Sequence, residues 1–434
     1  MLKHFYKVWS LFLLFVIFNA VPLYLRFNTN IIFKNQKSED FNINHPHPST
    51  TTLLWNFTTG DNINSISISS DGNYIVAGSD DNYTYLFNKT SSLSKTPIWD
   101  FSTEDNVSTV SISSDGNYIV AGSDDNHIYL FNRSKNYPIW NYTMGDLITQ
   151  VAISSDGSYV VAGCSDNQIS FLRNYNNTPL WNFSSSDKVK TVAISSDGNY
   201  IVAGSDNNKL FLFYRTSNET SWIFTAADDI NSVATTSNGN YIVAGTNDGD
   251  IYLFNSKSYP FPEWSYSSGA AIKMVAISSD GKYIVAGCEN NLTYLFEKSN
   301  AFPLWNYTTG GPVLSVAISA NGEHILIGSG DNRTYLFDKS ISNPIWSYVT
   351  LGKVKSVAIS SNGAYLAIGS DDDQIYLFYW SATILEEEDD DKLDIDFGEQ
   401  AISFSNFYLL FMAIAILSLI IIKKNKFLFE KDST

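Results

Sequence analysis

The chain has 434 residues, of which 15% are aromatic, and a formal net charge of −17 at pH 7. Proteins that bind nucleic acid need a basic surface to face the phosphates, so 27 basic residues against 44 acidic ones exclude a general nucleic-acid-binding protein. A long repeated region lies between two apolar segments near the ends of the sequence.

The first apolar segment, residues 8–25, follows two lysines. Such a segment is typical of a signal peptide or of an uncleaved signal anchor, and the lack of an Ala-x-Ala sequence before Val21 favours the anchor. We assign residues 1–27 to this element and leave its cleavage open. Residues 28–51 are rich in Asn, Pro and Thr and are expected to form a polar stalk.

Residues 52–381 contain eight copies of one pattern, each with a tryptophan and a Gly-x-Tyr-Ile-Val-Ala-Gly-Ser-like segment. Successive tryptophans are 41 to 44 residues apart, and the glycines that open the segments repeat the same intervals. A constant period of this length indicates supersecondary units that bury their faces against each other. The tryptophans are Trp55, Trp99, Trp140, Trp181, Trp222, Trp264, Trp305 and Trp346.

One repeat predicts four short strands. Within residues 109–143, the runs 110–112, 118–123, 128–131 and 139–142 are rich in β-branched and aromatic residues. Asp, Asn and Gly separate the runs, and these residues tolerate the backbone geometry of tight turns. Four antiparallel strands in each of eight repeats predict an all-β protein, an eight-bladed β-propeller.

The repeats resemble two known families. Ser79-Asp-Asp-Asn before Tyr85-Leu-Phe resembles the turn that precedes the Trp-Asp pair of WD40 repeats. Phe replaces that tryptophan and the Gly-His dipeptide is missing, so the WD40 hydrogen-bond tetrad cannot form here as such. Pro-x-Trp, followed by Thr-Gly at 59–60 and 309–310, is similar to the repeat of pyrroloquinoline-quinone (PQQ) propellers. Both resemblances imply a propeller over residues 53–380.

The last set of three strands ends near Phe378 without a Pro-x-Trp strand after it, whereas an unpartnered strand around Trp55 precedes the first set. We therefore expect the N-terminal strand to complete the eighth blade, which would leave no open sheet edge at the seam.

Acidic residues define the candidate binding site. The loops between blades are expected to share one face of the ring with the turns between second and third strands. Glycine, alanine, proline and one lysine replace acids in the loops before blades 6 to 8. The lopsided charge predicts a protein partner, in particular a basic one. The predicted binding residues are Asp61, Glu104, Asp105, Asp146, Asp187, Asp228 and Asp229.

Acids in the turns have a simpler interpretation, because an aspartate often caps its own tight turn. This group comprises Asp80, Asp81, Asp124, Asp125, Asp166, Asp206, Asp248, Glu289, Asp331, Asp371 and Asp372.

Twelve Asn-x-Ser/Thr sequences are candidates for N-glycosylation if the ring lies outside the cell. Four of them recur directly after the repeat tryptophan, so they are copies of one event. The twelve are Asn56, Asn82, Asn88, Asn106, Asn132, Asn141, Asn176, Asn182, Asn218, Asn291, Asn306 and Asn332.

The remaining residue types predict no catalytic or metal site. Cys164 and Cys288 replace the serine of Ala-Gly-Ser in separate blades, so they are expected to be buried free thiols. The histidines lack zinc-ligand spacing, and no nucleophile or phosphate-loop motif occurs. We therefore expect no cofactor, and the short loops make a small-molecule ligand an unfavoured alternative.

The C-terminal part predicts a membrane anchor. Residues 382–402 include a dense acidic run and are expected to be an extended linker. Residues 403–423 are long and apolar enough to cross a bilayer, and the lysines that follow place residues 424–434 in the cytoplasm. The propeller is then extracytoplasmic, anchored in the cell membrane.

These features predict a non-enzymatic scaffold that binds proteins or glycans. Two alternatives rest on resemblance: a PQQ-dependent dehydrogenase, and an envelope assembly or secretion factor. The dehydrogenases carry long loops over the channel, a calcium site and, in many members, adjacent cysteines, and none of these is visible here. The identity of the partner and the oligomeric state stay open.

Overall fold

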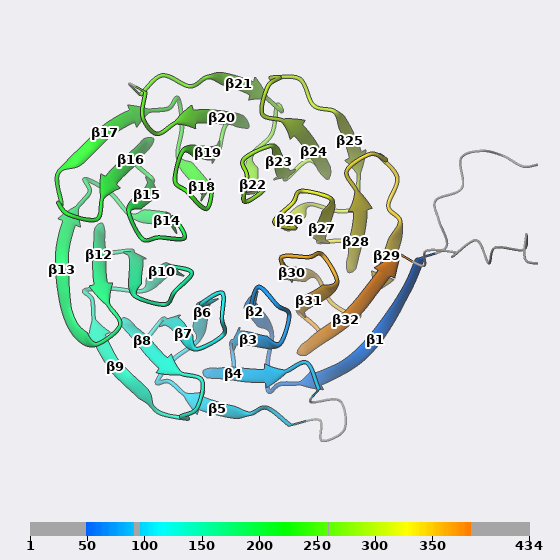
Figure 1. Cartoon of the computed structure of the whole chain (residues 1–434), viewed down its shortest axis with the longest axis horizontal. Coiled ribbons are helices and arrows are strands. Elements are labelled where there is room, and N and C mark those ends of the chain that lie inside the picture. Colours follow the sequence, from blue (N-terminus) through cyan, green and yellow to red (C-terminus); the bar gives the residue numbers. More distant parts are fainter. Residues whose placement is uncertain (1–48, 91–95, 259, 383–434) are drawn as a thin grey trace, which may run out of the picture. The chain divides into compact units, whose positions relative to one another are not determined.

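The repeated segments form eight sheets arranged in a ring (Figure 1). The computed structural model describes residues 49–90, 96–258 and 260–382, which fall within one compact unit. Both predicted membrane segments lie outside the described residues. Within the described ranges, no helix has the length and apolar character needed to cross a membrane.

Blades 1 to 4 each contain four consecutive antiparallel strands, ordered from the channel to the rim. Blade 1 has β2 (Ile63–Ile68), β3 (Tyr74–Ser79), β4 (Tyr83–Asn88) and β5 (Trp99–Ser102); blade 2 has β6 (Val107–Ile112), β7 (Tyr118–Ser123), β8 (His127–Asn132) and β9 (Pro138–Thr143). Blade 3 has β10 (Ile148–Ile153), β11 (Tyr159–Cys164), β12 (Gln168–Arg173) and β13 (Asn176–Ser184); blade 4 has β14 (Val189–Ile194), β15 (Tyr200–Ser205), β16 (Lys209–Tyr214) and β17 (Thr220–Thr225).

Blades 5 to 7 repeat this order, and blade 8 differs in its outermost strand. Blade 5 has β18 (Ile230–Thr235), β19 (Tyr241–Thr246), β20 (Asp250–Asn255) and β21 (Trp264–Ser267); blade 6 has β22 (Ile272–Ile277), β23 (Tyr283–Cys288), β24 (Leu292–Glu297) and β25 (Trp305–Thr308). Blade 7 has β26 (Val313–Ile318), β27 (His324–Ser329), β28 (Arg333–Asp338) and β29 (Trp346–Val349); blade 8 has β30 (Val354–Ile359), β31 (Tyr365–Ser370), β32 (Gln374–Ala382) and β1 (Ser49–Thr58).

The N-terminal strand β1 completes blade 8, which confirms the predicted closure of the ring. It pairs antiparallel with β32 in a register that runs from Ser49 opposite Ala382 to Thr58 opposite Gln374. The strand begins at Ser49 rather than at residue 52, so part of the segment interpreted as a stalk belongs to the sheet.

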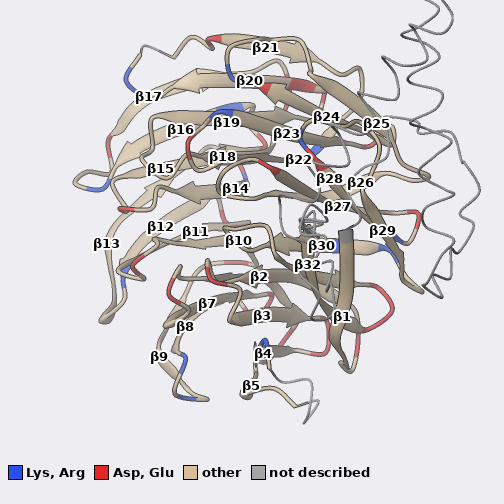
Figure 2. Cartoon of the chain, turned by 45° about the vertical axis from the view of Figure 1, so that its right-hand side comes forward, with Lys and Arg blue, Asp and Glu red and all other residues tan. Residues whose placement is uncertain are grey.

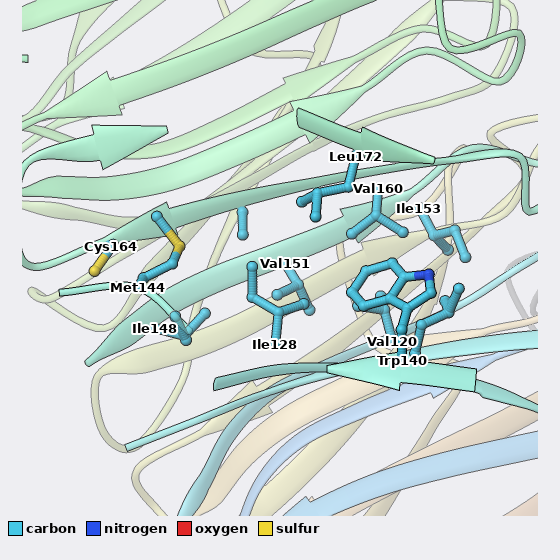
Figure 3. Close-up of a cluster of buried hydrophobic side chains, with 12 residues drawn as sticks. Val120, Ile128, Trp140, Met144, Ile148, Val151, Ile153, Val160, Cys164 and Leu172 are labelled. Atoms are coloured by element: carbon cyan, nitrogen blue, oxygen red, sulfur yellow. The ribbon is translucent and has the colours of Figure 1, made fainter. Parts of the chain in front are cut away.

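Each blade buries its faces against its two neighbours. Where blades 2 and 3 meet, Trp140, Val120 and Ile128 pack with Val151 and Val160 in one cluster (Figure 3). The first five repeat tryptophans are at most 9% exposed, and the last three are half-buried. The tryptophans are therefore mainly core residues, as predicted.

A tyrosine latch joins adjacent blades near the channel. The first residue of the second strand in one blade lies against the turn glycine of the next, as Tyr365 does against Gly72. Gly72 has a φ of 71°, and a Cβ built on it would lie 2.2 Å from Cδ2 of Tyr365. In several blades a cation completes the latch; Lys89 Nζ lies 4.9 Å from the ring centroid of Tyr365. Glycine is needed in this turn for both its backbone conformation and its lack of a side chain.

The turns between first and second strands also form a closed circle of backbone hydrogen bonds. The N–H group of Ser70 donates to the carbonyl of Ser114 in the next blade, and each equivalent residue repeats this contact until Ser361 donates to Ser70. The eight N···O distances lie between 2.9 and 3.3 Å. The members are Ser70, Ser114, Ser155, Ser196, Ser237, Ser279, Ala320 and Ser361.

The latch between blades 7 and 8 differs from the others. His324 occupies the tyrosine position and Trp380 the cation position, with ring centroids 4.3 Å apart. Burial lowers the pKa of His324; the neighbouring carboxylates of Asp338 and Glu323 act in the opposite direction, and Lys339 adds to the lowering. The folded ring thus favours the neutral imidazole.

This histidine predicts a pH-dependent stability. Its pKa is lower in the folded than in the unfolded protein, so the unfolded state binds more protons as the pH falls, and the free energy of unfolding should decrease as the pH falls through the ordinary histidine value of about 6.5. His324→Tyr, which installs the residue of the other blades, should reduce this decrease in chemical denaturation. An equal pH dependence in both proteins would contradict the assignment.

Candidate binding face around the central channel

One face of the ring, here called the mouth, carries the loops between blades and the turns between second and third strands. The two sets are joined directly. The N–H groups of Gly60 and Gly145 each donate to the turn aspartate of the following blade, Asp81 and Asp166, at 2.7 Å. In Figure 2 most acidic residues lie in loops and turns, while the strands carry few charges.

The seven predicted binding acids all lie on the mouth but differ in their surroundings. Five occupy equivalent loop positions, where one carboxylate oxygen accepts a hydrogen bond of 2.8 Å from the N–H group of the next residue. This contact uses only part of each carboxylate's capacity, and four of the five residues are exposed. The five are Asp61, Asp105, Asp146, Asp187 and the half-buried Asp228.

The other two predicted acids behave differently. Glu104 is exposed, and its backbone N–H donates to Asp125 in the turn of the following blade at 3.1 Å. Asp229 is half-buried and forms an ion pair with Lys190, with Oδ2 and Nζ 3.3 Å apart. Asp229 is therefore partly neutralised by the protein itself.

Several turn acids have the structural role that the sequence suggested. Oδ1 of Asp81 accepts from the N–H of Tyr83 at 3.0 Å, and Oδ2 accepts from the hydroxyl of Tyr85 at 2.6 Å. Burial and this hydrogen bond raise the pKa of the Tyr85 phenol far above its usual range. Asp81, the hydroxyl of Tyr85 and the N–H group of Gly60 in the inter-blade loop form one hydrogen-bonded network. In this network the tyrosine stands in for the side chains of the WD40 tetrad that the sequence lacks. The arrangement recurs at Asp331 and Tyr335.

The residue just before these caps contacts a side chain of the innermost strand, and the sequence analysis did not separate this position from the caps. Asp80 accepts from the side-chain amide of Asn64, and Asp371 forms an ion pair with Lys355, with Oδ1 and Nζ 2.8 Å apart. Lys190 and Lys273 make similar pairs with Asp206 and Glu289. The signal was present in the second residue of each innermost strand: Asn64, Ser108, Thr149, Lys190, Asn231, Lys273, Leu314 and Lys355.

Lysines on the innermost strands reduce the part of the mouth that carries uncompensated negative charge. In blades 4, 6 and 8 a lysine beside the channel balances nearby carboxylates. The described mouth segments of blades 1 to 3 carry neither lysine nor arginine. Burial and the nearby carboxylates of Asp105 and Asp80 raise the pKa of Asp124. Lys355 also forms an ion pair with Asp80 of blade 1, with Nζ and Oδ2 4.0 Å apart. The other carboxylates over blades 1 to 3 have no lysine or arginine partner among the described residues, and they form a narrower sector than predicted.

The cysteines are buried free thiols, as predicted. Burial raises the pKa of Cys164 to about 12 and that of Cys288 to about 11, which disfavours a reactive thiolate. Within the described ranges, no three His, Cys, Asp or Glu side chains gather in a way that would hold a metal ion.

Seven of the twelve glycosylation candidates fall into two structural classes. The asparagines that follow repeat tryptophans, Asn56, Asn141, Asn182 and Asn306, are exposed on outer strands. By contrast, Asn82, Asn291 and Asn332 adopt positive φ in tight turns, and the threonines of their sequons are fully buried. The outer-strand group is the more accessible in the folded protein, and its modification stays a prediction.

Comparison with known proteins agrees with this geometry. The WD domain, G-beta repeat, matches residues 51–88, 95–132, 140–171, 177–213, 303–338 and 345–378, and the VID27 C-terminal WD40-like domain matches residues 214–300. A search of curated proteins gave no match. The crystal structure of the computationally designed Ika8 protein shares the fold, with a TM-score of 0.67 and 14% identity over 75% of this chain and 99% of that chain. The matched repeats extend over all eight blades, and the chain is a WD40-repeat β-propeller protein.

Proposed function

We propose that this protein is a membrane-anchored, extracytoplasmic scaffold whose acidic mouth binds a basic segment of a partner protein. WD40 propellers commonly bind proteins and are generally non-enzymatic scaffolds. The finer assignment is supported mainly by the uncompensated carboxylates over blades 1 to 3. A mouth sector of one charge attracts an oppositely charged partner and orients it during the encounter.

The position of the chain ends within the ring supports this arrangement. Thr58 and Gln374 lie at the mouth end of the seam, whereas Ser49 and Ala382 pair at the opposite end. The start of β1 and the end of β32 therefore both lie on the side of the ring away from the mouth. Anchoring through residues 8–25 and 403–423 would leave the mouth open to a partner. In intact cells, external protease should then reach the ring but not a tag on the C-terminal tail.

Neutralising the acidic sector tests the binding role. We expect the triple variant Glu104→Gln, Asp105→Asn and Asp146→Asn to lose at least about tenfold affinity for a decalysine peptide at low salt, because each charge contributes to long-range attraction. The amides keep an oxygen that can accept the loop N–H bonds. Titration by fluorescence anisotropy at several salt concentrations measures both affinity and its salt dependence.

A matched control removes the same charge from the opposite face. Asp71, Asp115 and Asp156 lie in turns whose equivalents elsewhere are Asn238, Asn321 and Asn362, so asparagine is compatible with these positions. The variant that carries asparagine at all three should bind decalysine as the parent does. Equal losses in both triple variants would reduce the effect to net charge and would contradict a specific mouth site.

A further inference from the structure

A separate cavity lies between blades 3 and 4, toward the end of the strands that is remote from the mouth. It has a volume of about 370 Å³, within the range of pockets that accept small groups. The walls combine two arginines with aromatic and aliphatic side chains. The lining residues are Tyr159, Arg173, Leu180, Trp181, Arg215 and Thr216, and we call this cavity the arginine pocket.

Both arginines of the pocket approach one tyrosine. Nη1 of Arg215 donates to the hydroxyl of Tyr159 at 3.1 Å, and its guanidinium carbon lies 4.9 Å from the centroid of that ring. Arg173 donates to the hydroxyl of Tyr175, and its interactions with Tyr175 and then Tyr159 raise its pKa. Two guanidinium groups are therefore held around a shared aromatic side chain.

Neither guanidinium has an acidic partner among the residues that the structure describes. Among the ion pairs of residues 49–90, 96–258 and 260–382, none involves Arg173 or Arg215. Two adjacent cations without counter-charges repel each other, and an anion placed between them would relieve that repulsion.

This pairing of arginines occurs at one blade junction because blade 3 departs from the repeat. Cations comparable to Arg215 occur at other junctions, but Arg173 has uncharged or acidic equivalents: Asn88, Asn132, Tyr214, Asn255, Glu297, Asp338 and Tyr379. Blade 3 also exchanges the Leu-Phe order of its third strand for Phe171-Leu172. Phe171 consequently stacks on Tyr159, with centroids 5.5 Å apart and planes 9° apart, and it also contacts Trp181.

The local packing makes the pocket a firm, partly apolar support. The Tyr159 ring is held between Phe171 and the turn at Gly198, where a Cβ would lie 2.5 Å from the tyrosine. Leu180 is 39% exposed beside the buried Trp181. An oxyanion can thus meet the two planar guanidinium forks while the group that carries it covers Leu180.

We propose that the arginine pocket binds an oxyanion that a partner polypeptide carries on an apolar or aromatic stem. Phosphate monoester, sulfate monoester and carboxylate share the chemistry that planar guanidinium groups recognise through paired, charge-assisted hydrogen bonds. Clusters of arginines recognise phosphorylated or acidic motifs in this way. The site goes beyond the proposed function, because it uses other residues and the opposite charge.

The test uses the full chain in detergent and four probes: phenyl phosphate, phenyl sulfate, phenylacetate and uncharged phenol. Isothermal titration calorimetry should show saturable binding of at least one anion and none of phenol. The order of affinities among the three anions shows whether the pocket prefers a phosphate monoester, a sulfate monoester or a carboxylate. Arg173→Asn, which installs the residue of blades 1, 2 and 5, should weaken the best anion at least about tenfold, because it removes one charge-assisted donor group.

Two further variants separate recognition from folding. Arg215→Lys keeps the charge and follows Lys89, Lys298 and Lys339 of other blades, so it should fold but bind less tightly through loss of the planar fork. Arg133→Gln removes an arginine that lies 4.2 Å over Tyr74 without a second arginine, and it should leave binding unchanged. Absence of anion binding, undiminished binding by Arg173→Asn, or equal loss in Arg133→Gln would overturn the proposal. Decalysine binding at the mouth is independent of each of these results.

Discussion

Replacing Trp55 with alanine is expected to lower the free energy of unfolding by about 3–5 kcal/mol, the range for truncating a large buried aromatic side chain. The indole is 6% exposed, its ring centroid lies 5.0 Å from that of Phe87, and its Nε1 donates to the carbonyl of Lys89 at 3.1 Å. The side chain thus connects β1 of blade 8 to blade 1. Equilibrium denaturation with urea measures the loss.

Trp99 is the matched control. It has nearly the same burial, a ring contact of 5.1 Å with Phe131 and a hydrogen bond of 2.9 Å to the carbonyl of Arg133. Its strand β5 follows β4 in the chain, whereas β1 reaches β32 from the other end of the sequence. Trp99→Ala should cost similar stability, but only Trp55→Ala should accelerate hydrogen exchange along β32. Undisturbed exchange there would show that the seam does not depend on Trp55.

The second large effect is expected at the turn glycines of the latch. Gly72→Ala should destabilise the ring by about 1–2 kcal/mol through its left-handed backbone conformation and by a further 1–3 kcal/mol or so through overpacking. The added methyl group would meet Tyr365, whose ring cannot withdraw without breaking the latch between blades 8 and 1. Thermal or chemical denaturation of the variant measures the sum.

Gly269 separates the two contributions. Its φ of 76° is close to that of Gly72, but a Cβ at this loop position would meet nothing within 4 Å. Gly269→Ala should therefore show the conformational cost alone. If both substitutions cost the same, steric contact with Tyr365 does not limit the turn, and the latch is softer than the geometry indicates.

Much of the fold followed from the repeated residues. The spacing of the tryptophans predicted the number of blades, and the position of Trp55 before the first three-strand set predicted the closure with β32. These predictions succeed because blade-to-blade packing requires the same residue at the same place in each copy. The different roles of the adjacent residues Asp80 and Asp81 were harder to predict from the sequence. Asp80 contacts the innermost strand, whereas Asp81 caps its own turn and contacts the inter-blade loop.

The candidate sites depended more strongly on contacts between repeats. The sequence predicted acids on the mouth, but the neutralising role of Lys190 required its distance to Asp229, which lies in the next blade. Arg173 and Arg215 also belong to adjacent blades and meet only when the ring forms. Composition and spacing do not predict contacts between residues of adjacent blades. The departure of blade 3 from the repeat was nevertheless visible in the sequence, and it lies at this pocket.

The circle of eight backbone hydrogen bonds through Ser70 and Ser361 has a consequence for motion. In an open row of repeats, each end unit has one neighbour and frays first. A closed circle has no terminal unit, and removing one blade breaks two of its bonds at once. Movement of a single blade away from the ring is therefore resisted by its hydrogen bonds to both neighbouring blades. The circle lies on the face opposite the mouth and limits how far neighbouring blades can separate, so the arrangement of the blades that carry the mouth carboxylates is set before a partner binds.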